Sequence, residues 1–282
     1  TYALPRRFGY GVVDYLRLLR LASTAIKDVE SRIRVIGGIG AAPRAGLTHE
    51  FIEQGGLRWV DVLDLHLYEA PRAAESYEED FRELEQLMQA HGGPKPMWIT
   101  EWGCYADDDP ACDPPTVGDA AMNRCRWPTE RAASEHIVKF ATVALAHGVE
   151  RIFFHAGTCG AINQPDAGGV LFEYGGAPRK MYPAVAVFTR LVGVPGRLAG
   201  RVERDGWVAF VFETSEGATA VLWAVDGRTH EFEGGRGIQW LDLMGNVLSG
   251  GRLRLGGTPV YVRAANPAEL LACLEARAPA RP

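Results

Sequence analysis

Apolar residues recur with two different periods along the first part of the chain. In residues 11–30 (GVVDYLRLLRLASTAIKDVE) they fall three and four positions apart, with charges between them, which predicts an amphipathic helix. Similar stretches, two of them with Ser76 and Thr129 as expected N-caps, predict further helices at 48–54, 76–91, 129–147 and 181–191. Short apolar runs between the helices predict strands at 34–38, 59–68, 96–103 and 151–155.

This alternation of helices and strands predicts parallel strands joined by crossover helices, an α/β fold. The four strands are half of the eight that close a (β/α)₈ TIM barrel. A four-stranded doubly wound sheet is the alternative, but no Gly-rich phosphate loop opens any of the predicted helices. We therefore expect a partial TIM-barrel domain at 1–195, containing barrel strands 5–8 and their helices.

The pattern changes at about Arg197, where helical spacing gives way to short strands separated by Gly-containing turns. The predicted strands are 207–213, 218–225, 230–233, 238–243, 252–255 and 258–263. Such spacing predicts a small all-β sandwich at 196–266, followed by a C-terminal tail at 267–282. Three tryptophans of this region could bind sugar, but a sandwich core needs large side chains, so we expect Trp207, Trp223 and Trp240 in the core.

The stretch PMWITEWG (96–103) ends an apolar run with a lone carboxylate, Glu101. Because side chains alternate along a strand, Ile99 and Glu101 are expected to share an inward face, with Trp98 and Thr100 on the other. Glu101 would then lie at the carboxyl end of the strand, where barrel active sites are found. Trp102 is expected to form an apolar wall for a sugar ring. The alternative is a surface Glu that only ends a strand.

The strand WVDVLDLHLY (59–68) has two different faces. Its alternate leucines suit packing under helices, whereas Asp64, His66 and Tyr68 share the opposite face. An interior polar face near the end of a strand indicates a site. The alternative is a hydrogen-bonded His and Tyr in the core, without a functional role.

Composition excludes several classes of partner. The chain has 282 residues, of which 47% are hydrophobic, and this is enough for a sizeable core and two domains. Its net charge is a mild −5. No basic cluster suggests nucleic acid binding, and no apolar run approaches the roughly 20 residues that span a bilayer. We expect neither a nucleic acid nor a membrane partner.

The chain contains five cysteines, of which four fall in two long predicted loops, after Gly103 and after His155. They are Cys104, Cys112, Cys125, Cys159 and Cys273. No short Cys or His-Cys spacing typical of metal ligands occurs, so we expect no metal and no cofactor. Disulfides that staple the loops of an exported protein are favoured over free thiols, which predicts an extracellular or periplasmic location.

Four strands in this order resemble the C-terminal part of a clan A glycoside hydrolase. They are RVIGG, VDVLDLHLY, PMWITEWG and RIFFH, the last preceded by AHGVE. The resemblance is to the β-xylosidase and α-L-iduronidase type and to cellulase-like relatives, and it covers nearly the whole chain. The later LDLMGN and GGTPVYV are similar to the accessory sandwich that follows the barrel in many of those enzymes.

The resemblance implies a (β/α)₈ barrel and retaining hydrolysis by two carboxylates. It places the nucleophile at Glu101, at the end of the seventh strand. His66 and Tyr68 match sixth-strand positions that line the pocket, where the Tyr commonly hydrogen-bonds the nucleophile. His155 matches an eighth-strand position near the bound sugar, where an aromatic residue is common.

The implied mechanism needs a second carboxyl about 5–5.5 Å from the first. In the family this acid/base follows an Asn at the end of the fourth strand, and the present sequence contains no Asn-Glu pair. The chain starts at Thr1 without a signal peptide, and we expect it to begin just after the acid/base. We expect this half to be inactive alone and its sheet edges to favour aggregation. Glu69 and Glu173 are weaker candidates for the partner acid, since Glu69 is turned away from the Tyr68 face and Glu173 lies in a long loop.

The leading hypothesis is a retaining glycosidase acting on an oligo- or polysaccharide of plant or microbial origin. The alternative is a non-catalytic carbohydrate-binding or scaffold protein that kept the fold. A metal-dependent hydrolase using His66, His155 and cysteines is a third, weaker hypothesis. The sequence indicates neither the sugar nor the oligomeric state.

Overall fold

The computed structural model describes residues 8–106, 108, 125–155, 170–172, 176–193, 196–204, 206–233, 237–249 and 252–276. Its first part is a four-stranded parallel sheet in the order β1-β2-β3-β4. The strands are β1 (Ile36–Gly37), β2 (Val62–Leu67), β3 (Met97–Trp102) and β4 (Val149–Phe154). The helices between and after them are α2 (Val12–Val29), α3 (Gly46–Glu53), α4 (Tyr77–Ala90), α6 (Glu130–Ala146) and α7 (Met181–Val192), with short 3₁₀ helices η1 (Gly56–Trp59) and η2 (Ala74–Ser76). The predicted alternation of helices and parallel strands is therefore present.

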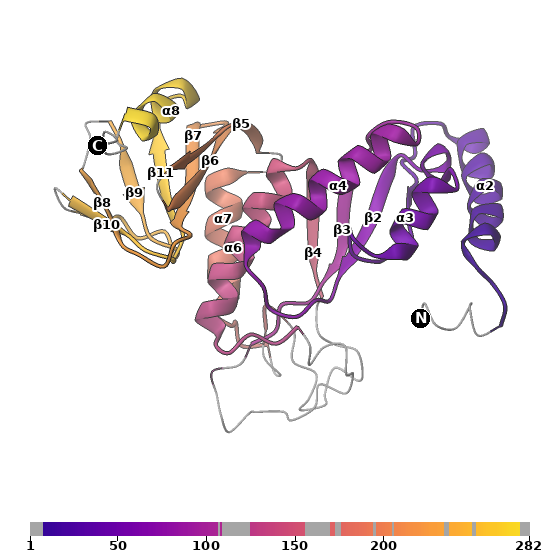
Figure 1. The fold of residues 1–282 in the computed structure, drawn as a ribbon, viewed down its shortest axis with the longest axis horizontal. Helices are drawn as coiled ribbons and strands as arrows, with labels where there is room; N and C mark the ends of the chain where they lie inside the picture. The colour runs from indigo at the N-terminus through magenta and orange to yellow at the C-terminus, as the bar shows by residue number, and fades with distance from the viewer. Residues whose placement is uncertain are drawn as a thin grey trace.

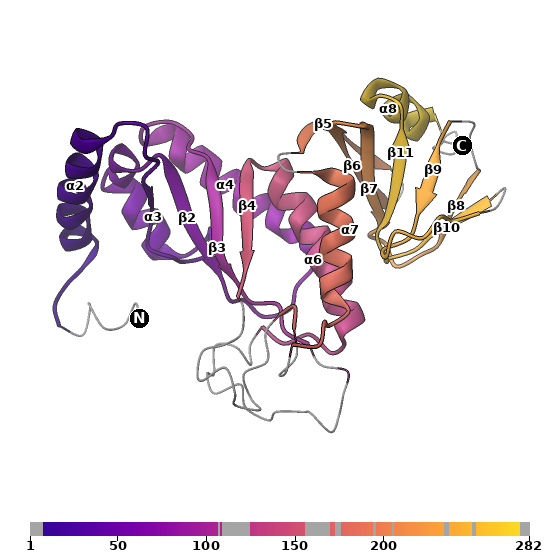
Figure 2. The same ribbon diagram turned by 180° about the vertical axis from the view of Figure 1, so that it is seen from behind.

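The two faces of the parallel sheet have different surroundings. Helices α4 and α6 lie across one face in Figure 1, whereas Figure 2 shows β2, β3 and β4 with no described helix in front of them. The leucines of β2 belong to the covered face, since Leu63, Leu65 and Leu67 are at most 1% exposed. Their packing under the helices confirms the prediction from the alternation of this strand.

The uncovered face carries large side chains that a closed barrel would bury. Ile36 in β1 and Phe153 in β4 are 41% and 45% exposed. The ring of Trp98 in β3 lies 6.0 Å from that of Phe153, and the guanidinium of Arg151 lies 4.8 Å above the Trp98 ring. Aromatic and cationic side chains thus form an open sheet face, which is called the open face below.

The two expected N-caps have different outcomes. The Thr129 hydroxyl accepts a hydrogen bond from the Ala132 amide at 3.1 Å and caps α6, as predicted. Ser76 does not cap α4, because it adopts helical dihedrals and belongs to η2. Its hydroxyl instead donates to the carbonyl of Ala73 at 2.6 Å.

The second part is built on a five-stranded antiparallel sheet in the order β5-β6-β7-β11-β9, with a two-stranded sheet of β8 and β10 beside it. The strands are β5 (Arg197–Arg204), β6 (Trp207–Thr214), β7 (Gly217–Ala224), β8 (His230–Glu233), β9 (Gln239–Leu241), β10 (Arg252–Leu255) and β11 (Val260–Ala264). Strand β5 was not predicted: it lies at the edge of the sheet, and every position except Val202 is exposed or only half-buried. An edge strand of this kind lacks the apolar run by which its neighbours are recognised.

The five-stranded sheet is apolar on both faces. One face packs with the helices of the first part through Phe210, Val221 and Trp223, which share their cluster with residues of α6 and α7. The other face packs against the two-stranded sheet and helix α8 (Pro267–Ala276), whose Leu270 and Leu274 are buried. Part of the range expected to be a tail therefore forms a helix that closes the second core.

The tryptophans of the second part lie in the core, as expected. Trp207, Trp223 and Trp240 are 2%, 0% and 5% exposed. All three pack on aromatic neighbours: Trp207 contacts Phe232 edge-on, Trp240 packs on the same Phe232 ring with centroids 5.6 Å apart, and Trp223 stacks on Phe210. Their rings are unavailable to a sugar.

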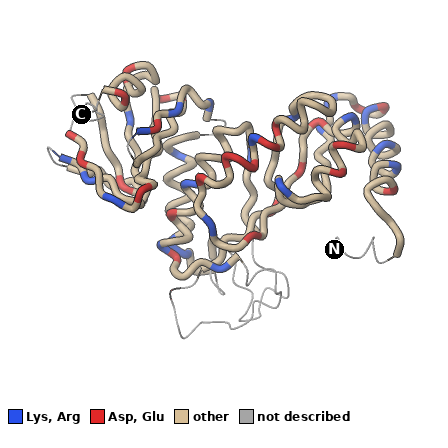
Figure 3. Tube along the Cα trace, in the orientation of Figure 1, with Lys and Arg blue, Asp and Glu red and all other residues tan. Residues whose placement is uncertain are grey.

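Acidic and basic residues are interspersed over the described surface (Figure 3). None of the helices that the structure describes has both the length and the apolar character that a membrane span requires.

Helix α6 carries a buried histidine that makes stability depend on pH. His136 lies between the rings of Trp102 and Trp127, at centroid distances of 6.0 and 4.3 Å. Burial, and to a lesser degree the charges of Lys139 and Arg72, lower its pKa to about 3. The unfolded chain, with a histidine pKa of about 6.5, therefore takes up a proton before the folded chain does.

Accordingly, the contribution of neutral His136 to the free energy of unfolding is fully present above about pH 6.5 and is lost as the pH falls toward 3. We expect the free energy of unfolding to fall by up to about 1.4 kcal/mol per pH unit from this group alone. Urea denaturation between pH 4 and 7 measures the slope, and the difference between wild type and His136→Gln isolates this histidine from the carboxylates. Equal slopes in the two proteins would contradict the assignment.

Candidate active site

Two neighbouring parallel strands bring a carboxylate, a phenol and an imidazole together at their carboxyl ends. The Tyr68 hydroxyl, just after β2, donates to Oε2 of Glu101 in β3 at 2.9 Å. Nδ1 of His66 lies 3.3 Å from the same oxygen. Glu101 remains 46% exposed, so its carboxylate is held on one side and open on the other.

Glu101 reaches this position through a β-bulge in β3. Leu65 of β2 pairs with Ile99, but the next residue, His66, pairs with Glu101. On the other side, Ile99 and Trp102 pair with residues of β4 that are only two positions apart. Strand β3 therefore contains one extra residue between Ile99 and Trp102.

The bulge corrects the expected assignment of faces in β3. Ile99 is fully buried in the core on the helix side and does not share a face with Glu101. Thr100 lies with Glu101 on the open face, because its hydroxyl donates to Asp64, which shares a face with His66. Simple alternation would place consecutive residues on opposite faces, and the extra residue of the bulge turns Thr100 and Glu101 to the same side.

The bulge also determines the position of Trp102, whose expected role as a sugar-binding wall does not agree with the structure. The Trp102 side chain is 2% exposed. Its ring packs at centroid distances of 4.4 Å from Phe140 in α6 and 5.3 Å from Phe154 in β4. Trp102 is a core residue beneath the site.

Asp64 supports the site from within the sheet. It accepts a hydrogen bond from Thr100, and its Oδ2 lies 3.7 Å from Nε2 of His66. The imidazole of His66 thus has one carboxylate near each ring nitrogen, Asp64 on one side and Glu101 on the other. This arrangement fixes the ring between the two acids.

Tyr105 joins the site and was missed from the sequence. Its hydroxyl lies 2.8 Å from Nδ1 of His155, which follows β4. The His155 ring is also 6.0 Å from that of Tyr68, edge to face. Burial lowers the pKa of His155, opposed by the charge of Glu101, so the neutral imidazole predominates at pH 7. His155 therefore lies beside Tyr68 at the candidate site, as the predicted position requires. Contact between His155 and a sugar stays a prediction.

Gly103 permits the close approach of the two tyrosines. A Cβ at this position would lie 2.7 Å from Cδ1 of Tyr68 and 2.9 Å from Cε2 of Tyr105. Both distances are below van der Waals contact, and both rings are held by hydrogen bonds. Only glycine therefore fits without a steric clash at position 103, where the chain leaves the sheet after β3.

We expect Gly103→Ala to displace the Tyr68 ring and to lower the free energy of unfolding by about 1–3 kcal/mol, the usual cost of overpacking. Urea denaturation of the variant measures this change. Gly46→Ala is the matched control, because a Cβ there meets no atom within 4 Å. Equal stabilities of the two variants would contradict the steric role of Gly103.

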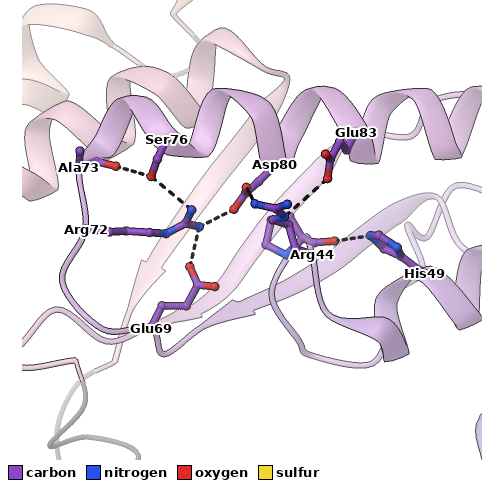
Figure 4. Close-up of polar contacts among 9 residues, drawn as sticks. Arg44, His49, Glu69, Arg72, Ala73, Ser76, Asp80 and Glu83 are labelled. Atoms are coloured by element: carbon purple, nitrogen blue, oxygen red, sulfur yellow. Dashed lines mark hydrogen bonds and ion pairs between the residues drawn. The ribbon is translucent and has the colours of Figure 1, made fainter.

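The Glu69 carboxylate belongs to a separate network, shown in Figure 4. Arg72 donates to Glu69 at 2.9 Å, to Ser76 at 3.2 Å and to the buried carboxylate of Asp80. Arg44 pairs with Asp80 from the other side at 3.2 Å. Through Arg72, Glu69 thus holds the segment that follows Tyr68 in place. Glu173, the other candidate for the partner acid, lies outside the described residues.

Two described cysteines, Cys104 and Cys273, take no part in the expected disulfides. Cys104 is a free thiol, fully buried, and burial raises its pKa well above the usual value. Cys112 and Cys159 lie outside the described residues. Within the described ranges, no group of three or more His, Cys, Asp or Glu side chains could hold a metal ion.

Comparison with known proteins supports the fold. No protein-family model matches the sequence, and no curated protein matches it. Among solved structures, a glucosidase from Croceicoccus marinus superimposes with a TM-score of 0.57 at 14% identity, over 90% of this chain and 64% of that one. A family 39 β-xylosidase from Caulobacter crescentus gives 0.52 at 14% identity, over 88% and 60%. A family 30 xylanase from Clostridium acetobutylicum gives 0.53 at 12% identity, over 90% and 60%.

The structural neighbours are thus glycoside hydrolases, and the mixed α/β fold with its parallel sheet is the fold that this chain shares with them. The chain spans less than two thirds of the length of each of these three proteins.

Proposed function

We propose that this chain is the C-terminal portion of a retaining clan A glycoside hydrolase, with Glu101 as its nucleophile. The observation that carries the proposal is the Tyr68–Glu101 hydrogen bond at the carboxyl ends of adjacent parallel strands. Active sites of (β/α)₈ barrels lie at this end of the sheet. The substrate is an oligo- or polysaccharide of plant or microbial origin, met outside the cytoplasm.

In this mechanism, a Glu101 oxygen attacks the anomeric carbon while the bond to the leaving oxygen breaks, giving a covalent glycosyl-enzyme. Tyr68 donates its hydrogen bond to Oε2 and leaves Oε1 as the attacking atom. The leaving oxygen takes its proton from a second carboxyl, which then removes a proton from the water that hydrolyses the intermediate. We assign this second carboxyl to a part of the protein outside this chain.

Two observations support a half barrel that is completed elsewhere. The open face exposes Ile36 and Phe153, positions that a closed barrel fills with interior side chains. The solved glycoside hydrolases are also longer, since this chain covers about 60% of the β-xylosidase and of the family 30 xylanase. In the proposed whole, β1–β4 are the last four barrel strands and the antiparallel sheets form an accessory sandwich.

The test is mechanism-based labelling of a protein in which this chain is extended to a complete barrel. A 2-deoxy-2-fluoro glycoside with a good leaving group accumulates the covalent intermediate of retaining enzymes. Mass spectrometry of the digested protein is expected to place one fluoroglycosyl group on the peptide containing Glu101. Turnover of the glycoside with the label on another carboxylate, or with no covalent label, would overturn the assignment.

A carbohydrate-binding or scaffold protein is the second candidate. One observation favours it: the acids near Glu101 in the described chain are committed elsewhere, Asp64 to Thr100 and Glu69 to Arg72. A scaffold of this kind would bind sugar equally well after Glu101→Gln and show no turnover even when the barrel is complete. Turnover by the extended protein would exclude it.

A further inference from the structure

A cavity lies on the opposite side of the parallel sheet from Glu101. Its volume is about 450 Å³, within the range of small-molecule sites, about 300–1,000 Å³. It is lined by the segment that leads into α4, by one side of α6 and by the end of β7. The residues that matter below are Glu75, Trp127, Glu135, His136 and Lys139. This cavity is called the α6 pocket.

The α6 pocket and the candidate active site are separated by the sheet. Helix α6 packs on the helix-covered face, where Phe140 contacts the Trp102 ring. Glu101 lies on the open face, where it meets Tyr68 and His66. A ligand in the α6 pocket therefore cannot contact the Glu101 carboxylate.

Three charged groups around the pocket have hydrogen-bonding capacity that the protein does not use. Lys139 is half-buried, and its ammonium forms no hydrogen bond or ion pair with any described residue. Burial lowers its pKa, although the charges of Glu75 and Glu135 oppose this effect. An ammonium has three donors, and a ligand with acceptor oxygens would satisfy them.

The two carboxylates each have one oxygen engaged. Oε1 of Glu135 accepts from the Thr258 hydroxyl at 2.8 Å and from Arg131 at 3.1 Å. Oε1 of Glu75 accepts from the indole nitrogen of Trp223. Oε2 of each accepts no hydrogen bond within the described part of the chain, so both oxygens are available to hydroxyl donors. These contacts also hold the two carboxylates in place.

The charges around the pocket select the kind of ligand. Arg72 also lines the pocket, but its charge is matched by Glu69 and Asp80. An anion would be attracted by Lys139 but repelled by Glu75 and Glu135, and a cation would be attracted by the two carboxylates but repelled by Lys139. A neutral molecule with several hydroxyl groups satisfies both kinds of partner, because each hydroxyl donates and accepts. Neutral sugars have this chemistry.

An aromatic wall completes the pocket. The half-buried Trp127 ring is held in place by stacking on His136, with centroids 4.3 Å apart and planes 26° apart. A rigid indole offers apolar area to the C–H face of a pyranose ring without a large loss of side-chain freedom. The neutral imidazole behind it adds no charge, since the pKa of His136 lies near 3.

We propose that the α6 pocket is a second saccharide-binding site, which takes a neutral sugar unit between Trp127 and the Lys139, Glu75 and Glu135 side chains. Such a site holds a sugar chain on the outer side of the sheet, independently of any reaction at Glu101. The proposal goes beyond the proposed function and does not require that this chain be catalytic.

The test is direct binding of neutral disaccharides, xylobiose and cellobiose, to the chain by calorimetry and by saturation-transfer NMR. We expect at least one to bind, and Lys139→Met and Glu135→Gln each to weaken binding at least about tenfold. Lys95→Met is the matched lysine control and is expected to bind as wild type does, whereas Glu101→Gln reports separately whether any sugar is held on the open face. Thermal unfolding of each variant shows whether its fold is intact.

Three outcomes would overturn the proposal. The first is no binding of either disaccharide at millimolar concentrations. The second is binding that survives Lys139→Met and Glu135→Gln but is lost in Glu101→Gln, which would place the sugar on the open face. The third is binding of glucuronic acid or glucosamine, but of neither disaccharide. Labelling of Glu101 is measured separately, so failure of this site leaves the nucleophile assignment standing, and the reverse also holds.

Discussion

Glu101→Gln, made in the protein with a complete barrel, is expected to lower kcat by on the order of 10⁴-fold or more while leaving the unfolding temperature unchanged. The amide keeps the size of the carboxylate, and its oxygen can still accept from Tyr68, so the fold loses little. It cannot form the glycosyl-enzyme, so the covalent route is closed. Steady-state kinetics with an aryl glycoside measure the loss.

Two comparisons make this result specific. Glu150→Gln removes a carboxylate at the start of the neighbouring strand β4, where it accepts from the Trp98 indole, and is expected to leave kcat nearly unchanged. Glu101→Ala is expected to recover turnover with added azide, which enters the vacated space and yields a glycosyl azide of inverted configuration. Normal kcat in Glu101→Gln would refute the nucleophile assignment.

Trp102→Ala is expected to destabilise the protein by about 3–5 kcal/mol, the usual cost of removing a buried Trp or Phe side chain. The ring is 2% exposed and joins β3 to α6 through Phe140. Because a domain of this size has a free energy of unfolding of about 5–15 kcal/mol, the variant approaches the limit of stability. Urea denaturation, or the yield of soluble protein, measures the effect.

Trp98→Ala is the matched comparison for this result. Its ring lies on the open face beside Phe153 and is only partly buried, so a smaller loss is expected. A variant Trp102→Ala that remains as stable as wild type but binds saccharide more weakly would restore the sugar-wall interpretation and contradict the structure.

Strand β2 could be predicted almost completely from the sequence. Its alternation is regular, and the covered and open faces are chemically distinct, so Leu65 and His66 could be assigned to opposite sides. The helices of the first part could be predicted equally well, because helical spacing depends on neighbours within a few residues, whereas α8 fell in the range expected to be a tail. The order of the parallel sheet follows from the same alternation of elements.

Strand β3 was harder because a bulge is a property of the strand pair. Glu101 was correctly placed at the carboxyl end of its strand, but Ile99 and Thr100 were assigned to the wrong faces, and Trp102 was given the role of a sugar-binding wall although it is buried. A bulge inserts one residue without a distinctive local sequence. Face assignments based on simple alternation are therefore wrong across the bulge, and nothing in the sequence signals the error. The contact between Tyr105 and His155 was also missed, because 50 positions separate the two residues and only the folded sheet brings them together.

The bulge has a further consequence for how this strand tolerates change. Glu101 supplies the carboxylate, whereas the inserted residue, Thr100, determines the face on which that carboxylate lies. A deletion of one residue there would keep every acid of the protein and still turn Glu101 toward the helices. The length of β3 is therefore constrained together with the identity of Glu101, and proteins that share this strand are best aligned on the bulge.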